Sequence, residues 1–334
     1  MVTRARIKDV AILAGVSTAT VSRALSSPTG VGPATRDKVM QAVEATGYRI
    51  NGAARDLRQR RARSILILAP NLANSFFGRI FAAIQEEASE AGLTVQISDS
   101  RIGRDRLESL GFDGRADGIV LLDGGLDPEV VNGWRLPLVQ LSEWNDAVDA
   151  PRLGIDNEAA AGLAADHLAR LGHRTVLHVS GPAGNVLAIG RQAGFLAAAA
   201  RRGIAAAVLP ADFTLEAGAE AARTWARMPR RPTGVFCASD ECALGFVSDC
   251  VRMGFDVPGD VSVVGFDDID FADRFLPPLT TIRQPRAEMG RAAAQRIVRM
   301  LRDAREPQRG PPPASSVRIE ATLIERASTG PAPA

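Results

Sequence analysis

The sequence contains few of the residues that bind metal ions or carry out redox chemistry. Its three cysteines, Cys237, Cys242 and Cys250, include no Cys-x-x-Cys pair. An odd number of cysteines without such a pair favours buried, reduced thiols over a metal or redox site. The three histidines lie six and five residues apart across an expected helix, turn and strand, so they do not share one face. We therefore expect structural roles for these residues and no metal site.

The chain also lacks a long apolar run. Without about 18 consecutive apolar residues, no transmembrane helix is expected. The first ten residues contain Arg4, Arg6, Lys8 and Asp9 instead of the apolar stretch of a signal peptide. We therefore expect a cytoplasmic protein.

Motifs typical of a nucleophilic hydrolase, a P-loop protein or a dinucleotide-binding protein are absent from the sequence. The stretch SGPAGNVLAIG contains glycines, but not with the dinucleotide-binding spacing. Asp267, Asp268 and Asp270 are clustered in one expected loop, where they suit hydroxyl ligands and turns better than an acid/base pair. We therefore expect no enzymatic activity and no cofactor.

Charge is divided unevenly along the chain. Residues 1–63 carry twelve Lys or Arg against four Asp or Glu, a balance of +8. The remaining 271 residues carry 28 against 34, a balance of −6, so the net charge of +2 hides the division. A basic segment on a mildly acidic body is typical of DNA binding, because cationic side chains release counterions from the phosphate backbone.

The stretch DVAILAGVSTATVSRAL, residues 9–25, predicts two short helices joined by a tight turn. Helices of this length are marginal alone, so they must pack on each other. Gly15 ends the first helix, and Ser17 is a suitable N-cap for the second. With Val21 and Leu25 turned inward, the second helix keeps a short polar outer face that ends in arginine. This pattern is typical of a helix-turn-helix, with a generic helical hairpin as the alternative.

A third helix is predicted by GPATRDKVMQAVEATG, with Pro33 at its first position and Gly47 at its C-cap. We expect Val39, Met40 and Val43 to close a small three-helix core.

The arginine-rich stretch YRINGAARDLRQRRARS follows the third helix and is poor in apolar residues. Gly52 costs a short helix about 1 kcal/mol relative to Ala. We therefore expect a linker or conditional helix that is disordered until something holds it.

From Ser64 onward, short apolar runs alternate with helical stretches. This alternation predicts an α/β fold with parallel sheets covered by helices on both faces. About 260 residues are many for one such sheet and enough for two lobes. Glycine and proline punctuate the strand ends, where open α/β sheets bind ligands. The final RASTGPAPA has no core-forming residues, so we expect a flexible tail.

Nearly the whole chain is covered, in order, by recognisable stretches: IKDVAILAGVSTATVSRAL, VGPATRDKVMQAVEATGY, DGIVLLDG, GRQAGF, SDECALGF and VPGDVSVVGFDDIDFADRFLPPLTTIRQP. Together they resemble the LacI/GalR family of bacterial transcriptional regulators. The expected recognition helix and the ADFTLEAG region are most similar to the cytidine repressor branch of that family.

The resemblance implies an all-α helix-turn-helix headpiece over residues 1–49, a hinge over 50–63 and a two-lobed core over 64–326, with residues 327–334 as the flexible tail. The core would be like that of the periplasmic sugar-binding proteins. A family member of this kind is a homodimer that binds a palindromic double-stranded DNA operator and responds to a small molecule in the cleft between the lobes.

We therefore predict a regulator, most simply a repressor, of genes for carbohydrate or nucleoside catabolism. A periplasmic-type sugar-binding protein is the main alternative, but that class needs a signal peptide and has no use for a basic headpiece. A sugar- or nucleoside-processing enzyme with the same lobes is a second alternative, and it would need a reactive constellation.

In the headpiece, the resemblance assigns DNA contacts residue by residue. Thr18, Ala19 and Arg23 match the family's major-groove positions, and the guanidinium of Arg23 fits guanine O6 and N7. Leu57 matches the leucine that the family inserts into the minor groove. Ile50 stands where proline is usual, which leaves the folding of the hinge open. Thr20, Ser22 and Asn51 suit phosphates, and Lys8, Ser17 and Ala54 complete the predicted set.

In the core, the family's effector pocket matches NSFFGR, SEW, GRQAGF, ADFT, CASD and GFDD. The resemblance implies that the aromatic residues Phe76, Phe77, Phe213 and Trp144 stack against a sugar or base. Arg191 and Asp267 would hold hydroxyl or carbonyl groups, with Glu143 and Ser239 adding polar contacts. A sugar or sugar derivative is the expected effector class, with a nucleoside as the alternative. Whether the effector induces or corepresses stays open.

Some family members form tetramers through a C-terminal leucine heptad helix, but this chain offers only ASTGPAPA after its last predicted strand region. We expect a dimer formed by the lobes, through apolar faces on residues 76–91 and 240–254. The region SDSRIGRDRLESLGFDGRADG is shorter than the family norm, which predicts a shortened helix there.

Overall fold

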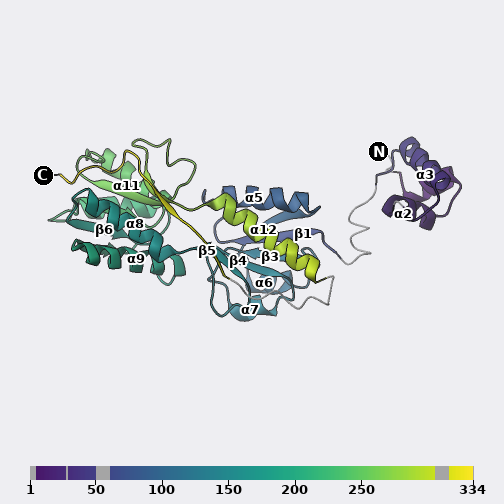
Figure 1. Cartoon of the computed structure of the whole chain (residues 1–334), viewed down its shortest axis with the longest axis horizontal. Coiled ribbons are helices and arrows are strands. Elements are labelled where there is room, and N and C mark those ends of the chain that lie inside the picture. The colour runs from purple at the N-terminus through teal and green to yellow at the C-terminus, as the bar shows by residue number, and fades with distance from the viewer. Residues whose placement is uncertain (1–4, 28, 50–60, 305–315, 334) are drawn as a thin grey trace. The chain divides into compact units, whose positions relative to one another are not determined.

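The computed structural model describes residues 5–27, 29–49, 61–304 and 316–333. The chain divides into two units, residues 1–61 and 62–334, and Figure 1 labels the elements of both. Within the described ranges, no helix combines the length and the apolarity that crossing a bilayer would require.

The described part of the first unit contains three helices: α1 Ile7–Ala14, α2 Thr18–Ser26 and α3 Pro33–Thr46. Val10, Val21 and Val39, one from each helix, are fully buried and form the centre of its core. The prediction for Met40 was wrong, because its side chain is 48% exposed. One residue further along a helix is about 100° further round, so Met40 leaves the face on which Val39 and Val43 lie.

The predicted helix boundaries in this unit are confirmed. Gly15 and Gly47 end α1 and α3 in the left-handed conformation, with φ of 64° and 61°. This conformation favours glycine because it has no Cβ. The Oγ of Ser17 accepts the backbone N–H of Thr20 at 3.1 Å and caps α2. Pro33 is the first residue of α3.

The second unit has two lobes, and each described lobe contains a six-stranded sheet. In the first, here called the N-lobe, the strand order is β11-β5-β4-β3-β1-β2 and every neighbouring pair is parallel. Its strands are β1 Ser64–Ala69, β2 Thr94–Asp99, β3 Gly118–Leu121, β4 Leu138–Leu141, β5 Arg152–Ile155 and β11 Val317–Ile319. Its helices are α5 Phe77–Glu90, α6 Arg104–Leu110, α7 Pro128–Gly133 and α12 Arg286–Asp303.

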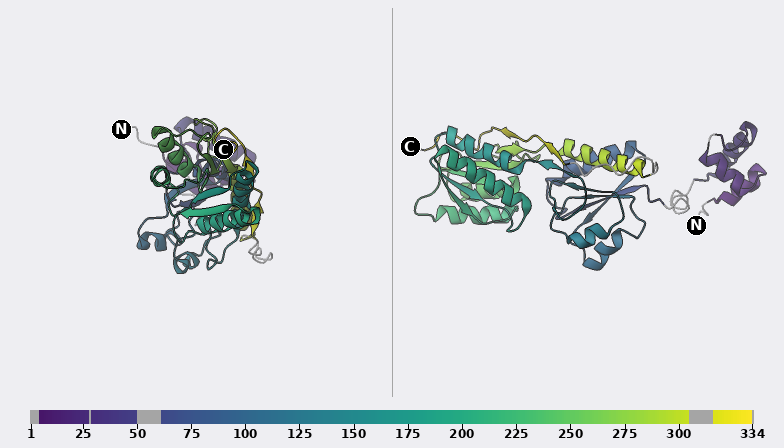
Figure 2. Two further views of the ribbon diagram at one scale, coloured as in Figure 1. Left: turned by 90° about the vertical axis from the view of Figure 1, so that its left-hand side faces the viewer. Right: turned by 60° about the horizontal axis from the view of Figure 1, so that its bottom comes forward.

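The second lobe, here called the C-lobe, has the strand order β12-β10-β9-β8-β6-β7, in which only β10 and β12 pair antiparallel. Its strands are β6 Thr175–Val179, β7 Ala205–Leu209, β8 Gly234–Cys237, β9 Ser262–Asp267, β10 Thr280–Arg283 and β12 Thr322–Ile324. Its helices are α8 Asn157–Arg170, α9 Val186–Arg202, α10 Leu215–Ala226 and α11 Asp240–Arg252. Figure 2 shows helices packed against the sheet of each lobe.

The burial and composition of each strand explain which strands can be recognised in the sequence. Every residue of β1, β3, β4, β8 and β9 is buried, and such strands read as continuous apolar runs. The apolar-run pattern does not reveal three of the strands, β5, β7 and β10. Their sequences RLGI, AAAVL and TTIR contain arginine, alanine or threonine in place of a continuous apolar run.

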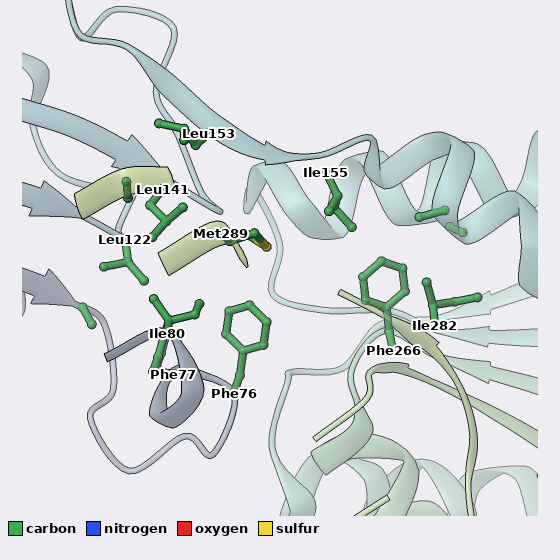
Figure 3. Close-up of a cluster of buried hydrophobic side chains, with 14 of the residues drawn as sticks. Phe76, Phe77, Ile80, Leu122, Leu141, Leu153, Ile155, Phe266, Ile282 and Met289 are labelled. Carbon is green, nitrogen blue, oxygen red and sulfur yellow. The ribbon is translucent and has the colours of Figure 1, made fainter. Parts of the chain in front are cut away.

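The lobes are joined where the chain passes from β5 to α8, from β10 to α12 and from β11 to β12. One hydrophobic cluster runs through both lobes at this junction. Figure 3 shows it, with Ile80, Leu141 and Met289 from the N-lobe and Phe266 and Ile282 from the C-lobe. The lobes therefore share a packed core close to the ends of their central strands.

The expectation of a flexible tail was wrong for residues 327–333. Ser328 is fully buried, accepts the N–H of Thr280 at 2.8 Å and donates to the carbonyl of Val263 at 2.6 Å. The N–H of Ala332 donates to the carbonyl of Leu171 at 2.9 Å. The segment is held by hydrogen bonds more than by apolar side chains, so its composition did not reveal it.

Two of the histidines hold the same C-terminal segment. The Nε2 of His167 lies 2.9 Å from Thr329 Oγ1, and the Nε2 of His173 lies 3.2 Å from the carbonyl oxygen of Gly330. Burial lowers the pKa of both rings. Together with the buried free cysteines, these contacts agree with the predicted structural roles.

Candidate effector cleft and DNA-contacting helix

The exposed face of α2 carries the predicted major-groove residues. Thr18, Ala19 and Arg23 are exposed, and Lys8 is exposed on α1. Ser22 and Thr20 are half-buried. Three further predicted residues, Asn51, Ala54 and Leu57, lie outside the described residues.

Ser17 and Thr20 have less freedom to contact DNA than their sequence positions suggest. The Ser17 Oγ caps α2 through the Thr20 N–H and also lies 2.9 Å from the Thr20 Oγ1. Both hydroxyls are therefore already engaged with each other. These two hydroxyl groups orient the start of α2. The side chains of Thr18, Ala19 and Arg23 are exposed and can make the predicted DNA contacts.

A cavity of about 780 Å³ lies between the two lobes. Its wall is built from segments that follow the carboxyl ends of β1, β3, β4, β6, β7, β8 and β9, where open α/β sheets place their ligands. The structure brings all eight predicted effector residues to this cavity: Phe76, Phe77, Glu143, Trp144, Arg191, Phe213, Ser239 and Asp267.

Arg191 and Asp267 approach each other across the cavity wall. Arg191 extends from α9, and its Nη2 lies 3.8 Å from the Asp267 Oδ1. The guanidinium donates from Nε to Asn157 Oδ1 at 3.0 Å and from Nη1 to the Ala238 carbonyl at 2.6 Å. Its Cζ lies 3.8 Å from the ring centroid of Phe266. A buried guanidinium with fixed partners gives the cleft a rigid planar donor.

Asp267 is held at the end of β9 in an unusual backbone conformation. Its φ is 121°, a value that costs free energy in a residue other than glycine and that occurs preferentially at functional sites. The Gln284 amide donates to its Oδ1 at 2.7 Å. Burial raises the pKa of Asp267 to about 6, although the charge of Arg191 opposes the change. Ser142 and Asn71 also line the cavity and have φ of 68° and 113°.

The aromatic residues of the cavity differ in their freedom to stack on a ligand. Phe76 and Phe77 are only 7% and 8% exposed and belong to the hydrophobic cluster of Figure 3. Their main role is therefore in the core, although both also line the cavity. Phe213 packs closely over Gly181, where a Cβ would lie 2.2 Å from its ring, and its ring centroid is 5.4 Å from the Arg191 Cζ. Phe213 and Trp144 are half-buried, so they are the better stacking surfaces.

Glu143 and Ser239 have contrasting polar environments. Burial raises the pKa of Glu143, and a hydrogen bond from the Asn185 side chain opposes this effect. The Ser239 Oγ accepts the N–H of Cys242 at 3.2 Å as the N-cap of α11 and donates to the Phe213 carbonyl at 3.3 Å. Its hydroxyl is therefore committed to the fold, which weakens its prediction as a ligand contact.

Sequence reasoning missed much of the polar wall. The additional polar and charged residues that line the cavity are Asn71, Asn74, Arg101, Asp123, Ser142, Asn145, Asp146, Asn185, Asp212 and Thr214. All of them lie in the loops that begin at the carboxyl ends of strands, and this position is the signal that could have identified them. The predicted short helix near the rim is present as α6, which has seven residues.

Sequence reasoning also missed Asp240, a buried residue that positions part of the cavity wall. It is fully buried, and its Oδ1 accepts the Thr281 hydroxyl at 2.5 Å. Its Oδ2 accepts the N–H of Ile269 at 2.9 Å, two residues after Asp267. Burial raises the pKa of Asp240 to about 7, and the charge of Asp267 adds to the increase. Asp240 thus ties the loop that carries Asp267 to α11 and β10.

We predict that Asp240→Asn changes the pH dependence of stability. Because burial raises the folded-state pKa of Asp240 above the usual Asp value, the wild type loses stability as pH rises from about 4 to about 7. The variant avoids this loss, at most about 1.4 kcal/mol for each pH unit. Urea unfolding of both proteins between pH 4 and 8 measures the difference.

The comparison must use the difference between the two proteins, because other groups titrate as well. Burial lowers the pKa of His178 to about 4, which favours the folded state as pH rises and acts in the opposite direction. His178 is present in both proteins, so its contribution cancels. Parallel stability curves for wild type and Asp240→Asn would contradict the assignment of a raised pKa to Asp240.

Comparisons with known proteins settle the family. Residues 6–51 match the family of bacterial regulatory proteins called the lacI family, and residues 165–329 match a periplasmic binding protein-like domain. The HTH-type transcriptional repressor CytR of Escherichia coli (strain K12) is 38% identical over 300 residues, which cover 87% of this chain and 88% of CytR. The chain belongs to the LacI family of bacterial regulatory proteins.

Solved structures of transcriptional regulators agree with the fold. The lac repressor dimer bound to operator and the anti-inducer ONPF superimposes with a TM-score of 0.85 at 26% identity, covering 98% of this chain and all of that one. The transcriptional regulator CelR in complex with cellobiose has a TM-score of 0.71 at 29% identity, covering 97% and 100% of the two chains.

As a LacI-family protein, the chain is a transcriptional regulator with a helix-turn-helix region and an effector-binding domain. The predicted family and fold class are confirmed, and the similarity to CytR agrees with the predicted branch. The alternative of a periplasmic-type sugar-binding protein is not supported, since residues 6–51 match the regulatory family. The matched relatives named here are transcriptional regulators and not enzymes.

Proposed function

We propose that this LacI-family regulator is a homodimeric repressor of genes for carbohydrate or nucleoside catabolism. It binds a palindromic operator in the cytoplasm through α2, and a small hydroxylated effector in the cleft alters that binding. The matches to a repressor dimer on its operator and to a regulator bound to cellobiose support this proposal. The single observation that carries it is the Arg191–Asp267 pair in the interlobe cavity.

The polar wall favours a ligand with several hydroxyl groups. The side-chain oxygens of Asn71 and Asn74 accept backbone N–H groups of their own loops, which leaves their Nδ2 groups as the available donors. The carboxylates of Asp267 and Glu143 supply acceptors. A hydroxyl both donates and accepts, so it can satisfy either kind of partner. Half-buried Phe213 and Trp144 add faces for a sugar ring or a base.

We predict that Arg23→Ala relaxes the sequence specificity of operator binding. If Arg23 reads a guanine in the major groove, its loss costs about 1–3 kcal/mol on the cognate operator and much less on an operator altered at that base pair. Fluorescence anisotropy with both DNA duplexes at fixed salt measures the two affinities. Lys38→Ala is the control, since Lys38 is an exposed cation on α3 and outside the predicted contacts. A uniform loss on all sequences would make Arg23 a phosphate contact.

The dimer interface that we propose is narrower than the one predicted from the sequence. The apolar faces of residues 76–91 and 240–254 were expected to form the interface, but α5 and α11 bury most of their apolar residues inside their own lobes. Exposed large apolar side chains remain on β2, at the C-terminal end of α11 and on the loop before β10: Ile97, Val251, Met253, Phe271 and Leu276. We propose that these side chains contribute to an isologous dimer interface.

We predict that Leu276→Asp disrupts the dimer. Leu276 is 82% exposed in a single chain, and a carboxylate at an isologous interface is repeated on both subunits. Light scattering should return a dimer for the wild type and a monomer for the variant at micromolar concentration. Leu163→Asp, on α8 and outside this set, should stay dimeric. A stable wild-type tetramer, or an unchanged Leu276→Asp dimer, would contradict the proposed assembly.

A further inference from the structure

The lining of the cleft has an excess of acidic groups, although one of them, Asp146, is paired with Arg152 outside the lining. Seven charged residues line the cavity, and five of them are carboxylates: Asp123, Glu143, Asp146, Asp212 and Asp267, against Arg101 and Arg191. Asp123 and Glu143 follow the adjacent strands β3 and β4, and each adds to the negative potential at the other. A cleft with low-dielectric walls concentrates the field of such charges.

Both arginines of the cavity wall already have carboxylate partners, which weakens their attraction for an anionic ligand. Arg191 is 3% exposed, and its Nε and Nη1 donate to Asn157 and to the Ala238 carbonyl, while its charge faces Asp267. Arg101 is an exposed residue of the rim, and it pairs with Asp99 at 3.4 Å. A phosphate group would therefore have to compete with the carboxylates of Asp99 and Asp267 for these two arginines.

The helix N-termini around the cavity are also occupied. A helix N-terminus attracts anions because its first N–H groups lack partners. Here Asn185 accepts the N–H groups of Leu187 and Ala188 at the start of α9. Thr214 caps α10 and Ser239 caps α11 by accepting the N–H of the residue three positions later. At the start of α5, the Asn74 side chain accepts the Phe76 N–H at 2.8 Å.

We propose that the cleft selects the uncharged, unphosphorylated form of its hydroxylated effector and rejects the phosphorylated or carboxylated form of the same compound. This inference rests on the proposed function, because it concerns the ligand of the same cleft. Asp123 and Glu143 are the specificity-determining residues, since they form an acidic pair on the N-lobe wall and neither makes a salt bridge among the described residues, although the charge of Arg191 acts on Glu143.

A preference for the neutral compound indicates which reactions supply the effector and which reactions remove it. An effector of this kind is supplied by import without phosphorylation, or by hydrolysis of a phosphoester or glycoside. Transfer of a phosphoryl group to one of its hydroxyls ends recognition, because the product carries negative charge into an acidic cleft. The regulator would then report the compound before the step that commits it to metabolism.

Matched ligand pairs test this proposal on the full-length protein. The probes are D-ribose with D-ribose 5-phosphate, D-glucose with D-glucose 6-phosphate, cellobiose with cellobionate, and cytidine with cytidine 5′-monophosphate, titrated by calorimetry in phosphate-free buffer. For each pair in which one member binds, we expect the neutral member to bind at least 100-fold more tightly. Equal or tighter binding of the charged member overturns the inference and leaves the proposed function standing. Failure of every pair to bind overturns the proposed effector class, and this inference with it.

Substitutions then test the residues. The double variant Asp123→Asn, Glu143→Gln keeps the shape of both side chains and removes two negative charges, so the preference for the neutral member should fall at least tenfold. Glu90→Gln, at the exposed end of α5, removes one charge outside the cleft and should leave the preference unchanged. A circular dichroism melt confirms that each variant is folded. A folded double variant with undiminished preference would overturn the role of Asp123 and Glu143.

Discussion

A fragment that begins at Ala62 should fold and should not retard operator DNA in a gel. Residues 62–334 form a separate unit with its own core, whereas the excess of positive charge lies in residues 1–63. We expect the loss of operator affinity to exceed about 1,000-fold, since both the base contacts and the counterion release of the headpiece are removed. The fragment starts at Ala62 because the N–H groups of Ala62 and Arg63 both donate to Asp117.

Effector binding provides the control for this experiment. Every described residue that lines the cleft belongs to residues 62–334, so the fragment should bind the effector with the affinity of the full chain. A thermal melt then separates a folded fragment that has lost DNA binding from a misfolded one. Specific retardation by the folded fragment would sink the assignment of DNA recognition to the headpiece.

Asp267→Asn should abolish the effector's influence on operator binding while leaving operator affinity within about threefold. A ligand shifts a conformational equilibrium only by its differential affinity for the two states, so a regulator that no longer grips its effector stays in one state. Asparagine tolerates positive φ better than most residues and can accept the Gln284 amide bond, which makes it a gentler change than Asp267→Ala at a φ of 121°. Both variants should give the same functional result.

Operator anisotropy with and without effector measures this response. Asp273→Asn serves as the control, because Asp273 lies in the same loop, is half-exposed and is absent from the cavity wall. It should respond like the wild type. If the effector changes the operator affinity of a folded Asp267→Asn protein as much as that of the wild type, Asp267 does not bind the effector.

The headpiece could be predicted from the sequence in most of its detail, because its structure depends on local signals. Gly15, Ser17, Pro33 and Gly47 act within one helical turn of the boundaries that they set. The error at Met40 came from the same local reasoning, since three apolar neighbours cannot all lie on one narrow helix face.

The cleft was predicted in part. The matched motifs identified Arg191, Asp267 and the aromatic residues, and all of them line one cavity. They could not show that Phe76 and Phe77 are mainly core residues or that the hydroxyl of Ser239 is already bonded. Those outcomes depend on partners that lie far away in the sequence.

The sequence by itself determined the helix boundaries of the headpiece, the alternation of buried strands with helices, the division of charge and the family, because spacing, caps and composition act over a few residues or over whole segments. Only the tertiary structure decided which polar groups are free to meet a ligand. Asp240 meets Thr281 across 41 positions, and Ser328 meets Val263 across 65. Contacts of this kind form only when distant strands pair and bury their polar groups, so no local pattern in the chain records them.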